Sequence, residues 1–537
     1  MIINRFACSF SSLKFSLFFT ALVCSLALNV SAYAENVLHR GNGAEPETLD
    51  LHKSTGVPEA NIQRDLFEGL VSVAADGSLI PGAAKSWEQD ETGKLWTFRL
   101  RDDGKWSNGE TVVASDFVNA FQRALSPETA SEYAFILWPV KHAKAINKGE
   151  IKDVTKLGIS APDDLTLKIE LENPTPYLTG LLSHHMTYPV YLKSIEEHGK
   201  KWTRPNNLVS NGPYQLAEWK PQTKLKVIKN PHYRDAENIH FDTVYFHPTE
   251  DTGAELKRFR AGELDVTEDV PSDQLKWIEK NLKANFRNTP YIGTYYFAMN
   301  LEEAPFKGNP DLRKALSFAI NRTILTEKVT KAGELPGLSW VPPGMNGYTS
   351  QAIPELSLAN KERVALAKSY YAKAGYSKDK PLEVELLYNT SENHKKIAIA
   401  ISAMWKQTLG VKVKLRNEEW KVYLNSRSQR QFQLVRSGWI GDYNDASNFL
   451  DLFRSDVGTM NPAGWKNVDY DGLMRQAETE LDADKRIDLM QQAEKILLSE
   501  MPLIPIYYYT TQHLLSPELK GWADNVMDIH PSRYLSK

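Results

Sequence analysis

A guanidinium, an indole and a carboxylate, those of Arg436, Trp439 and Asp442, lie within one short segment that contains two glycines. The apolar run Phe432–Val435 just before it predicts a strand. Side chains alternate along a strand, so Arg436 and Asp442 share a face if the strand continues, although the glycines permit a bend. A zwitterion such as a peptide needs this pair, an anion for its amine and a cation for its carboxylate. The alternative is a solvated ion pair at a strand end.

The length and composition indicate a folded protein of several domains. The chain has 537 residues, of which 42 % are hydrophobic and 24 % are charged. One hydrophobic core rarely supports this length, so two or three domains are expected. The net charge of −3 argues against a sequence-independent nucleic-acid binder, which needs a basic face.

The N-terminus has the pattern of a cleavable signal peptide. Arg5 and Lys14 precede an apolar run, Phe15–Val30, and an A-x-A site follows at residues 32–34. We predict a signal peptide over residues 1–34 with cleavage after Ala34, and therefore a periplasmic protein. An uncleaved membrane anchor is the alternative, which the small-residue site disfavours.

Both cysteines, Cys8 and Cys24, lie in the predicted signal peptide. Lipidation at Cys24 is disfavoured because Val23 stands where a processing site requires a small residue. The mature chain is then predicted to lack disulfides, thiol nucleophiles and thiolate metal sites.

Hydrophobic periodicity predicts alternating strands and helices. Helices are expected around Ile62, Leu66 and Leu70 and over 115–125, 312–329, 361–374 and 391–409. Strands are expected over 95–100, 165–171, 225–228, 244–246 and 411–415. This alternation predicts an α/β fold with largely parallel sheets.

Motifs for catalysis or metal binding are weak. Ser377–Lys380 has S-x-x-K spacing, but no partner motif of the serine acyl-enzymes accompanies it. No H-E-x-x-H or Walker motif occurs. His184 and His185 would point to opposite sides of a strand and so would not chelate one ion together. We therefore predict a protein that is not an enzyme and needs no cofactor or metal.

Four stretches together resemble a known family, the large extracytoplasmic solute-binding proteins of family 5 (cluster C). Residues 106–111 and 115–118 are similar to the family signature, and 211–214 and 386–396 resemble its oligopeptide-binding branch. The similarity extends from about Leu38 to the C-terminus. A murein-tripeptide-binding branch is close to the same pattern.

The resemblance implies a two-lobed periplasmic binding protein fold of type II with an extra inserted domain. Lobe I would combine residues 35–70, 190–292 and 510–537. The inserted domain II would span residues 71–189, and lobe III residues 293–509. The chain would cross between lobes near Ile292 and Tyr509, a connection that suits a hinge.

The resemblance also implies the ligand contacts. Asp442 corresponds to the residue that binds a peptide's amine, and Arg436 and His394 correspond to positions that meet its carboxylate, although Lys395 or Lys396 could replace His394. Main-chain pairing with an extended peptide is implied for Glu59, Ala60, Asn61, Gly438, Trp439 and Ile440. Pocket positions are implied for Trp420, Trp439, Tyr133, Tyr291, Tyr508 and Asn389. For the aromatic residues, ordinary core packing is the alternative, and Glu59 could be a solvated loop acid.

The predicted function is that of the substrate-binding component of an ABC importer, which captures short oligopeptides between its lobes. Its partners would be peptides and inner-membrane permease subunits, without nucleic acid, and the protein would be a monomer. Binding of murein tripeptide is the alternative within the family. Metal or haem binding, a chaperone role and peptide cleavage are more distant alternatives.

Overall fold

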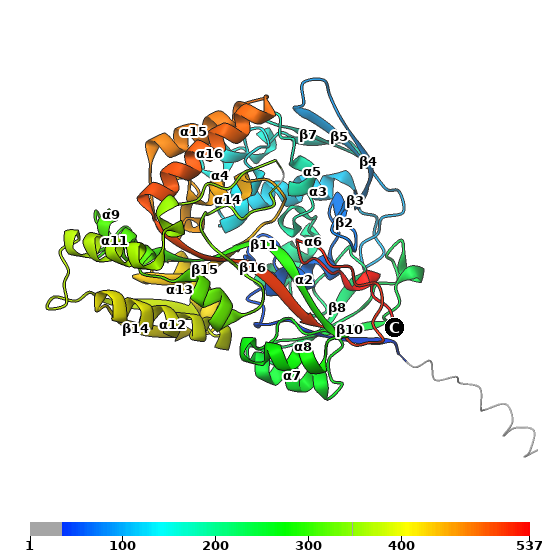
Figure 1. The fold of residues 1–537 in the computed structure, drawn as a ribbon. Helices are drawn as coiled ribbons and strands as arrows, with labels where there is room; N and C mark the ends of the chain where they lie inside the picture. The colour runs from blue at the N-terminus through cyan, green and yellow to red at the C-terminus, as the bar shows by residue number, and fades with distance from the viewer. Residues whose placement is uncertain (1–34, 346) are drawn as a thin grey trace, which may run out of the picture. The chain divides into compact units, whose positions relative to one another are not determined.

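Two long strands, β11 (Phe286–Met299) and β16 (Leu503–Leu514), pair antiparallel and lie side by side in Figure 1. The structure is a computed structural model that describes residues 35–345 and 347–537, so the predicted signal peptide lies outside the described residues. The pairing is irregular between Pro290 and Thr294. Proline has no amide hydrogen to donate, so the ladder is interrupted there. This irregularity lies at the predicted crossing between lobes.

β11 and β16 belong to a six-stranded sheet with the order β12-β16-β11-β15-β13-β14. The other strands are β12 (Leu335–Pro336), β13 (Glu383–Asn389), β14 (Lys412–Glu418) and β15 (Leu434–Ile440). β15 pairs antiparallel with β11 from Leu434 to Ile440, but it pairs with β13 only at Leu434 and Val435. Its β13-side edge therefore has no strand partner beyond Val435 among the described residues.

Two four-stranded sheets and a hairpin complete the strands. One sheet has the order β1-β10-β9-β8, with β1 (Val37–Gly41), β8 (Tyr214–Lys220), β9 (Lys224–Lys229) and β10 (Thr243–His247). The other has the order β4-β5-β7-β6, with β4 (Ala84–Gln89), β5 (Leu95–Leu100), β6 (Ile159–Asp163) and β7 (Thr166–Glu170). The hairpin pairs β2 (Val71–Val73) with β3 (Leu79–Pro81).

The prediction of largely parallel sheets is wrong. The parallel pairs of named strands are β1–β10, β13–β14 and β13–β15, and the other pairs are antiparallel. The connections β4–β5, β6–β7 and β8–β9 are too short for a parallel crossover, which needs a dozen or more residues. The lengths of these turns indicate antiparallel pairing, which the alternation of strands and helices did not.

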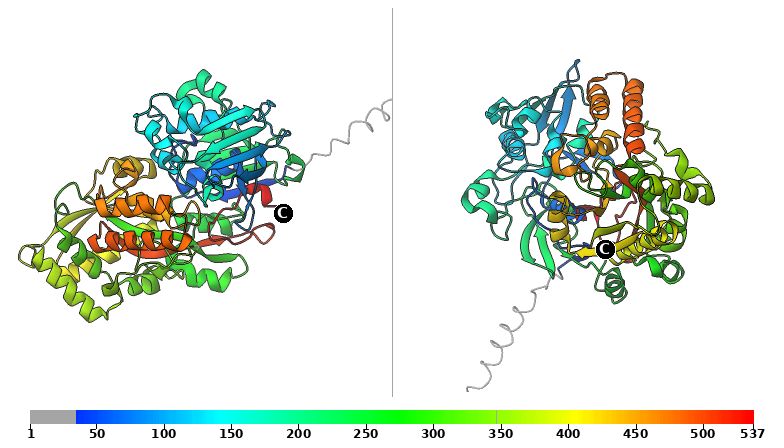
Figure 2. Two further views of the ribbon diagram at one scale, coloured as in Figure 1. Left: turned by 90° about the horizontal axis from the view of Figure 1, so that it is seen from above. Right: turned by 90° about the vertical axis from the view of Figure 1, so that its left-hand side faces the viewer.

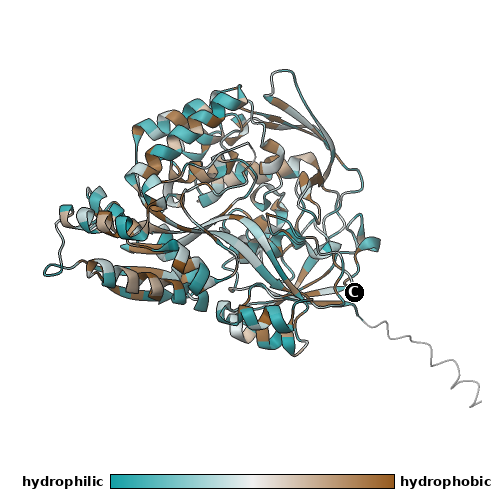
Figure 3. Ribbon diagram, viewed as in Figure 1, coloured by the Kyte–Doolittle hydropathy of each residue, from teal (hydrophilic) through white to brown (hydrophobic). Residues whose placement is uncertain are grey.

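Three predicted helices are present with nearly the expected bounds: α3 (Ala114–Leu125), α11 (Asn360–Lys373) and α12 (Glu392–Leu409). Ser391 caps α12 by accepting from the amide of His394, and Gly410, with a φ of 80°, ends the helix. Ile397, Ile401 and Trp405 are buried at a spacing of four. Polar and apolar bands alternate along this helix in Figure 3.

The single helix predicted over residues 312–329 is wrong. The structure has α9 (Pro310–Phe318), then α10 (Arg322–Ile324) and a π-helical segment to Thr330. Asn321 interrupts the run because its side chain accepts from the amide of Ile324 and starts a new helix. The Arg322 guanidinium donates to the carbonyls of Ser317 and Pro505, which fixes the break.

The remaining helices connect the sheets. They are α2 (Val57–Leu66), α4 (Ala143–Asn147), α5 (Leu178–Leu181), α6 (Leu192–His198), α7 (Thr252–Arg260), α8 (Leu275–Asn281), α13 (Trp420–Ser428), α14 (Ser447–Leu450), α15 (Val468–Thr479) and α16 (Ala483–Glu500). α15 and α16 lie side by side in both views of Figure 2. Within residues 35–345 and 347–537, no helix combines the length and the apolar character that a membrane span requires.

The sheets group by sequence range, but Val37–Lys537 forms one compact unit. β2 to β7 all come from the predicted inserted domain, and β1 and β8 to β10 come from predicted lobe I. β11 and β16 each run across a predicted boundary. The division into lobes therefore stays a prediction.

A buried carboxylate, that of Glu68, connects distant segments of the chain. It forms ion pairs with Arg234 and with Arg533 of the C-terminal tail, and it accepts hydrogen bonds from Tyr233 and Ser72. Burial by itself would raise the pKa of Glu68, but the two guanidiniums, Arg234 first, lower it overall. The ionised carboxylate thus holds the tail against the segment that precedes β2.

Replacing Glu68 by glutamine should destabilise the protein by about 3 kcal/mol, because the buried Arg533 guanidinium then lacks its anion and Arg234 keeps only the exposed Asp235 carboxylate. Urea denaturation measures the change. The matched control is Glu110→Gln, which removes an exposed carboxylate paired with Lys193 and should leave the midpoint nearly unchanged. Equal midpoints for both variants would contradict the role given to Glu68.

Candidate ligand-binding site

A cavity of about 380 Å³ lies where segments distant in sequence meet. Its wall includes residues of α2, α7, β11, α12, α13, β15 and β16, together with residues 249–250, 268–272 and 527–528. This volume is in the range of small-molecule sites. Twelve of the predicted site residues line it: Ala60, Asn61, Tyr133, Tyr291, Asn389, His394, Trp420, Arg436, Gly438, Trp439, Ile440 and Asp442.

Two predicted site residues, Glu59 and Tyr508, do not line the cavity. The Tyr508 hydroxyl accepts from the amides of Leu338 and Ser339, whereas its neighbours Tyr507 and Tyr509 line the cavity. Alternation along β16 therefore turns Tyr508 to the opposite face. Tyr508, predicted as a pocket residue, therefore faces away from this cavity, between two tyrosines that line it.

Glu59 is buried in the first turn of α2, not exposed in a loop. Its Oε1 accepts from the amide of Glu47 at 2.6 Å and from Trp420 Nε1 at 3.4 Å. Burial raises the pKa of Glu59 to about 7. The carboxyl thus supports the cavity wall from behind, through Trp420.

The Asp442 carboxylate is oriented by two side chains that the sequence did not indicate. The amide of Met186 donates to Nδ1 of His184, so Nε2 carries the ring proton and donates to Asp442 Oδ1 at 3.3 Å. Asn448 donates to Oδ2 at 3.1 Å, and its Oδ1 accepts from the Asp442 amide. The result is a fixed anion at the cavity wall.

His184 comes from the predicted inserted domain, and it does not lie on a strand as predicted. Residues 185–187 form a short 3₁₀ turn, and the rings of His184 and His185 lie 4.1 Å apart. In the sequence these adjacent histidines raised only the possibility of a metal site, which their expected geometry opposed, and no pattern indicated that His184 supports a carboxylate.

Stacked rings extend the wall beside Asp442. His184 stacks on Tyr133 at 5.1 Å, and Tyr133 stacks on Trp439 at 5.9 Å. Trp439 donates from Nε1 to Asn448 Oδ1 at 3.1 Å, the same oxygen that accepts from the Asp442 amide. This arrangement is rigid, apolar on its faces and suited to side chains of varied shape.

Arg436 is a buried cation without an anion. It donates to Asn389 Oδ1 at 2.9 Å and to the Tyr509 hydroxyl at 2.7 Å, and it lies over the Tyr295 ring. Its Nε has no partner, and within the described residues no carboxylate lies within ion-pair distance of its guanidinium. Because an unpaired buried charge is costly, the guanidinium is set up for an anionic ligand.

His394 is neutral at neutral pH, because burial and then the Arg436 charge hold its pKa well below the ordinary value. It can donate a hydrogen bond to a carboxylate but does not supply a positive charge. The alternative lysines do not line the cavity: Lys395 pairs with Glu392, and Lys396 pairs with Asp273.

Two more arginines line the cavity, Arg64 of α2 and Arg427 of α13. Within the described chain, neither guanidinium forms an ion pair. Sequence reasoning missed both because a lone arginine on a helix is usually a solvated one. Only the packing of the two helices against one cavity distinguishes them.

Several acids line the wall beside them, including Glu255, Glu268 and Asp269. Burial raises their pKa values to about 8, 7 and 6, respectively. Glu255 accepts from the amide of Glu268 at 2.8 Å, and its second oxygen has no partner. These carboxyls thus retain protons in the folded chain under conditions that would ionise them in water.

Glu255 should make the protein less stable as pH rises from about 5 to about 8. In that window the unfolded chain loses this proton and the folded chain keeps it, so each pH unit removes up to about 1.4 kcal/mol from the free energy of unfolding. Glu255→Gln should therefore flatten the dependence of Tm on pH. The control is Glu263→Gln, at an exposed glutamate paired with Arg258, which should keep the wild-type slope. An unchanged slope in Glu255→Gln would contradict this assignment.

Comparisons with known proteins fit this geometry. The family described as bacterial extracellular solute-binding proteins, family 5 Middle, matches residues 78–461. The chain is 40 % identical to the periplasmic murein peptide-binding protein MppA of Escherichia coli, over 91 % of each protein. It is also 40 % identical to the probable deoxycholate-binding periplasmic protein YgiS of E. coli, over 92 % of each. The crystal structure of Haemophilus influenzae OppA in complex with RPPGFSPFR has a TM-score of 0.91 and 36 % identity, with 94 % of this chain and 99 % of that chain covered. The chain therefore belongs to the family 5 bacterial extracellular solute-binding proteins and has the fold of their oligopeptide-binding members.

Proposed function

We propose that this protein is the periplasmic substrate-binding component of an ABC importer for short oligopeptides. The observation that carries the proposal is one cavity lined by both an oriented anion, Asp442, and an unpaired cation, Arg436. The six-residue separation spans at most about 20 Å of extended chain, enough for a zwitterion of a few residues. The amine would pair with Asp442 and the carboxylate with Arg436, assisted by His394.

The free edge of β15 supports main-chain recognition. Gly438, Trp439 and Ile440 line the cavity and pair with β11 on one side only. An extended peptide can add to the other edge by β-augmentation, which gives affinity without reading side chains. The aromatic wall then accepts varied side chains, a combination that suits a transporter of mixed peptides.

Ligand binding would close the lobes. The contacts His184–Asp442 and Glu59–Trp420 each join segments of different predicted lobes. A ligand that binds between such segments favours the closed state, and release to the permease requires that closure be reversible. We infer delivery to inner-membrane permease subunits, and export through the N-terminal signal, from the family and from the sequence.

Relatives with equal identity have different named ligands, so overall similarity does not select among them. A bile acid such as deoxycholate has a carboxylate but no amine, so it leaves Asp442 without a cation. The oriented carboxylate therefore favours a peptide. Native mass spectrometry of the purified protein is the direct test: co-purified peptides of mixed sequence support the proposal, and a bile acid or no ligand, together with no calorimetric heat from di- to pentapeptides, contradicts it.

Asp442→Asn should weaken binding of a free tripeptide by roughly 10- to 150-fold, since a charged hydrogen bond contributes about 1.5–3 kcal/mol. An N-acetylated tripeptide, which lacks the ammonium group, should bind wild type and variant with similar Kd. Isothermal titration calorimetry measures both ligands. Equal losses for the two would show that Asp442 does not bind the amine.

Murein tripeptide is the second candidate, and the extra cations favour it. Its γ-linked D-glutamate and diaminopimelate carry more than one carboxylate, and Arg427 and Arg64 line the cavity without anions of their own. One guanidinium would bind the additional carboxylate by a charge-assisted pair. A simple tripeptide has no group for that position.

Arg427→Met should reduce affinity for murein tripeptide by roughly 10- to 150-fold and leave trialanine nearly unchanged. Methionine keeps apolar volume and removes only the charge. Calorimetry with the two ligands on each protein distinguishes the candidates. If the affinities for both peptides fall equally, Arg427 does not recognise the additional carboxylate, and this result contradicts the murein candidate.

A further inference from the structure

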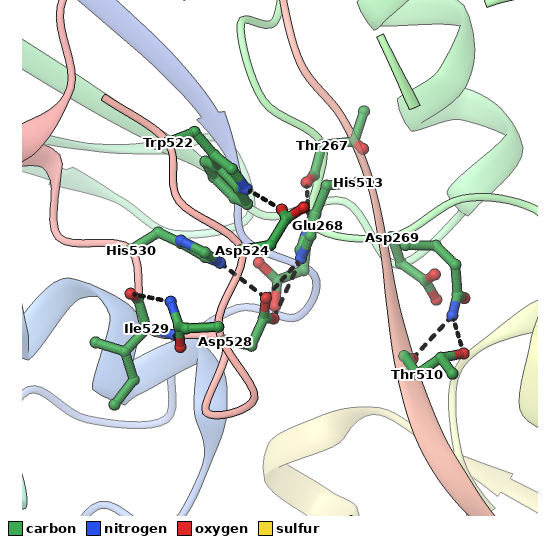
Figure 4. A network of polar contacts seen from close by, with 12 residues as sticks. Thr267, Glu268, Asp269, Thr510, His513, Trp522, Asp524, Asp528, Ile529 and His530 are labelled. Atoms are coloured by element: carbon green, nitrogen blue, oxygen red, sulfur yellow. Dashed lines mark hydrogen bonds and ion pairs between the residues drawn. The ribbon is translucent and has the colours of Figure 1, made fainter. Parts of the chain in front are cut away.

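Three metal-ligating side chains converge beside the cavity. They are His513 near the end of β16 and Asp528 and His530 of the C-terminal tail (Figure 4). Nε2 of His513 and Nε2 of His530 each lie 3.0 Å from Asp528 Oδ1. One ligand atom from each residue lies within 4.8 Å of the other two. The two imidazoles thus face a single carboxylate.

His513 has the supporting contact that metal-binding histidines usually have. Its Nδ1 is 2.9 Å from the carbonyl oxygen of Thr267, to which it donates. The Thr267 hydroxyl accepts from the amide of Leu514, so the carbonyl and the strand are held together. A backbone acceptor on Nδ1 directs Nε2 toward the metal and fixes the ring orientation.

His530 is held independently. Its ring stacks on Trp522 with centroids 3.6 Å apart and planes 19° apart, and Trp522 donates to Asp524. The His530 carbonyl accepts from Arg40 at 2.7 Å, which anchors the tail to β1. Both rings are therefore placed before any ligand arrives, which lowers the entropy lost on binding.

We propose that His513, Asp528 and His530 form a binding site for a divalent transition metal ion such as Zn²⁺. Two imidazoles and a carboxylate are ligands that Zn²⁺ accepts and that Ca²⁺ and Mg²⁺ do not favour. Asp528 also lines the cavity, as does Glu268 beside it. The site would bind the ion with three protein ligands and leave a fourth position to water or a further ligand.

The ion would stabilise the fold locally. It would join the end of β16 to the tail that also supplies Arg533 to the buried Glu68 network. The site does not depend on the proposed peptide function, because none of the three side chains is assigned to peptide recognition. The rival explanation is a simple ion pair between the histidines and Asp528.

Isothermal titration of purified, untagged wild-type protein with Zn²⁺ should show one binding site per chain and a raised Tm. Asp528→Asn and His530→Gln should each weaken that binding at least 10-fold. The matched control is His142→Gln, which alters an exposed histidine 3.9 Å from the Glu172 carboxylate and should retain the site.

X-ray absorption of the wild-type Zn²⁺ complex provides a readout that does not depend on the folding of any variant. It should show two imidazole nitrogens and oxygen ligands at about 2.0–2.2 Å. Absence of one-to-one binding by wild type, undiminished binding by variants whose circular dichroism is native, or a spectrum without two imidazoles would each overturn the proposal.

Discussion

The antiparallel pairing of β11 with β15 is the constraint on which the site depends. It holds β15 on one side and leaves the other edge without a strand partner beyond Val435 among the described residues, because β13 pairs only with Leu434 and Val435. The same strand carries Arg436 and ends just before Asp442, so one backbone element sets the distance between the two charges. Unpaired strand edges usually invite aggregation, but here the edge lies in a cavity.

Uncompensated charge is the second feature of the cavity. Arg436, Arg427 and Arg64 have no anion among the described residues, and burial raises the pKa values of Glu255, Glu268 and Asp269. The buried carboxylate of Glu68, by contrast, is paired with two arginines. Cavity charges that have no partner of opposite sign keep free energy available for a ligand.

The side chains of the cavity wall are held by residues that are distant from them in the sequence. His184 orients Asp442, Glu59 holds Trp420, and the tail residues Asp528 and His530 meet His513 of β16. Each contact joins segments that the chain separates by other elements. The cavity, its predicted closure and the proposed metal site thus all depend on contacts between segments that are distant in sequence. One such contact joins the C-terminal tail to β1.

The sequence by itself determined the elements with strong local signals. α12 was predictable because Ser391 and Gly410 mark its ends and Ile397, Ile401 and Trp405 recur at helical spacing. Twelve of the fourteen predicted site residues line the cavity, and their selection came from resemblance to a family and not from periodicity. Local patterns failed at Asn321, whose cap divides a helix, and in the sheets, whose antiparallel pairing follows from turn length.

Only the tertiary structure decided which polar residues are buried and what they face. Tyr508 differs from Tyr507 and Tyr509 only in the side of β16 that it occupies, which requires the strand register. The sequence predicts Arg427 and Arg64 as surface residues, but in the structure their helices, α13 and α2, come together at the cavity. His394 is neutral because burial and then the neighbouring Arg436 charge hold its pKa well below the ordinary value, and neither cause is visible in the sequence. Long-range packing sets burial and charge environment, and these two quantities decide what a polar side chain can bind.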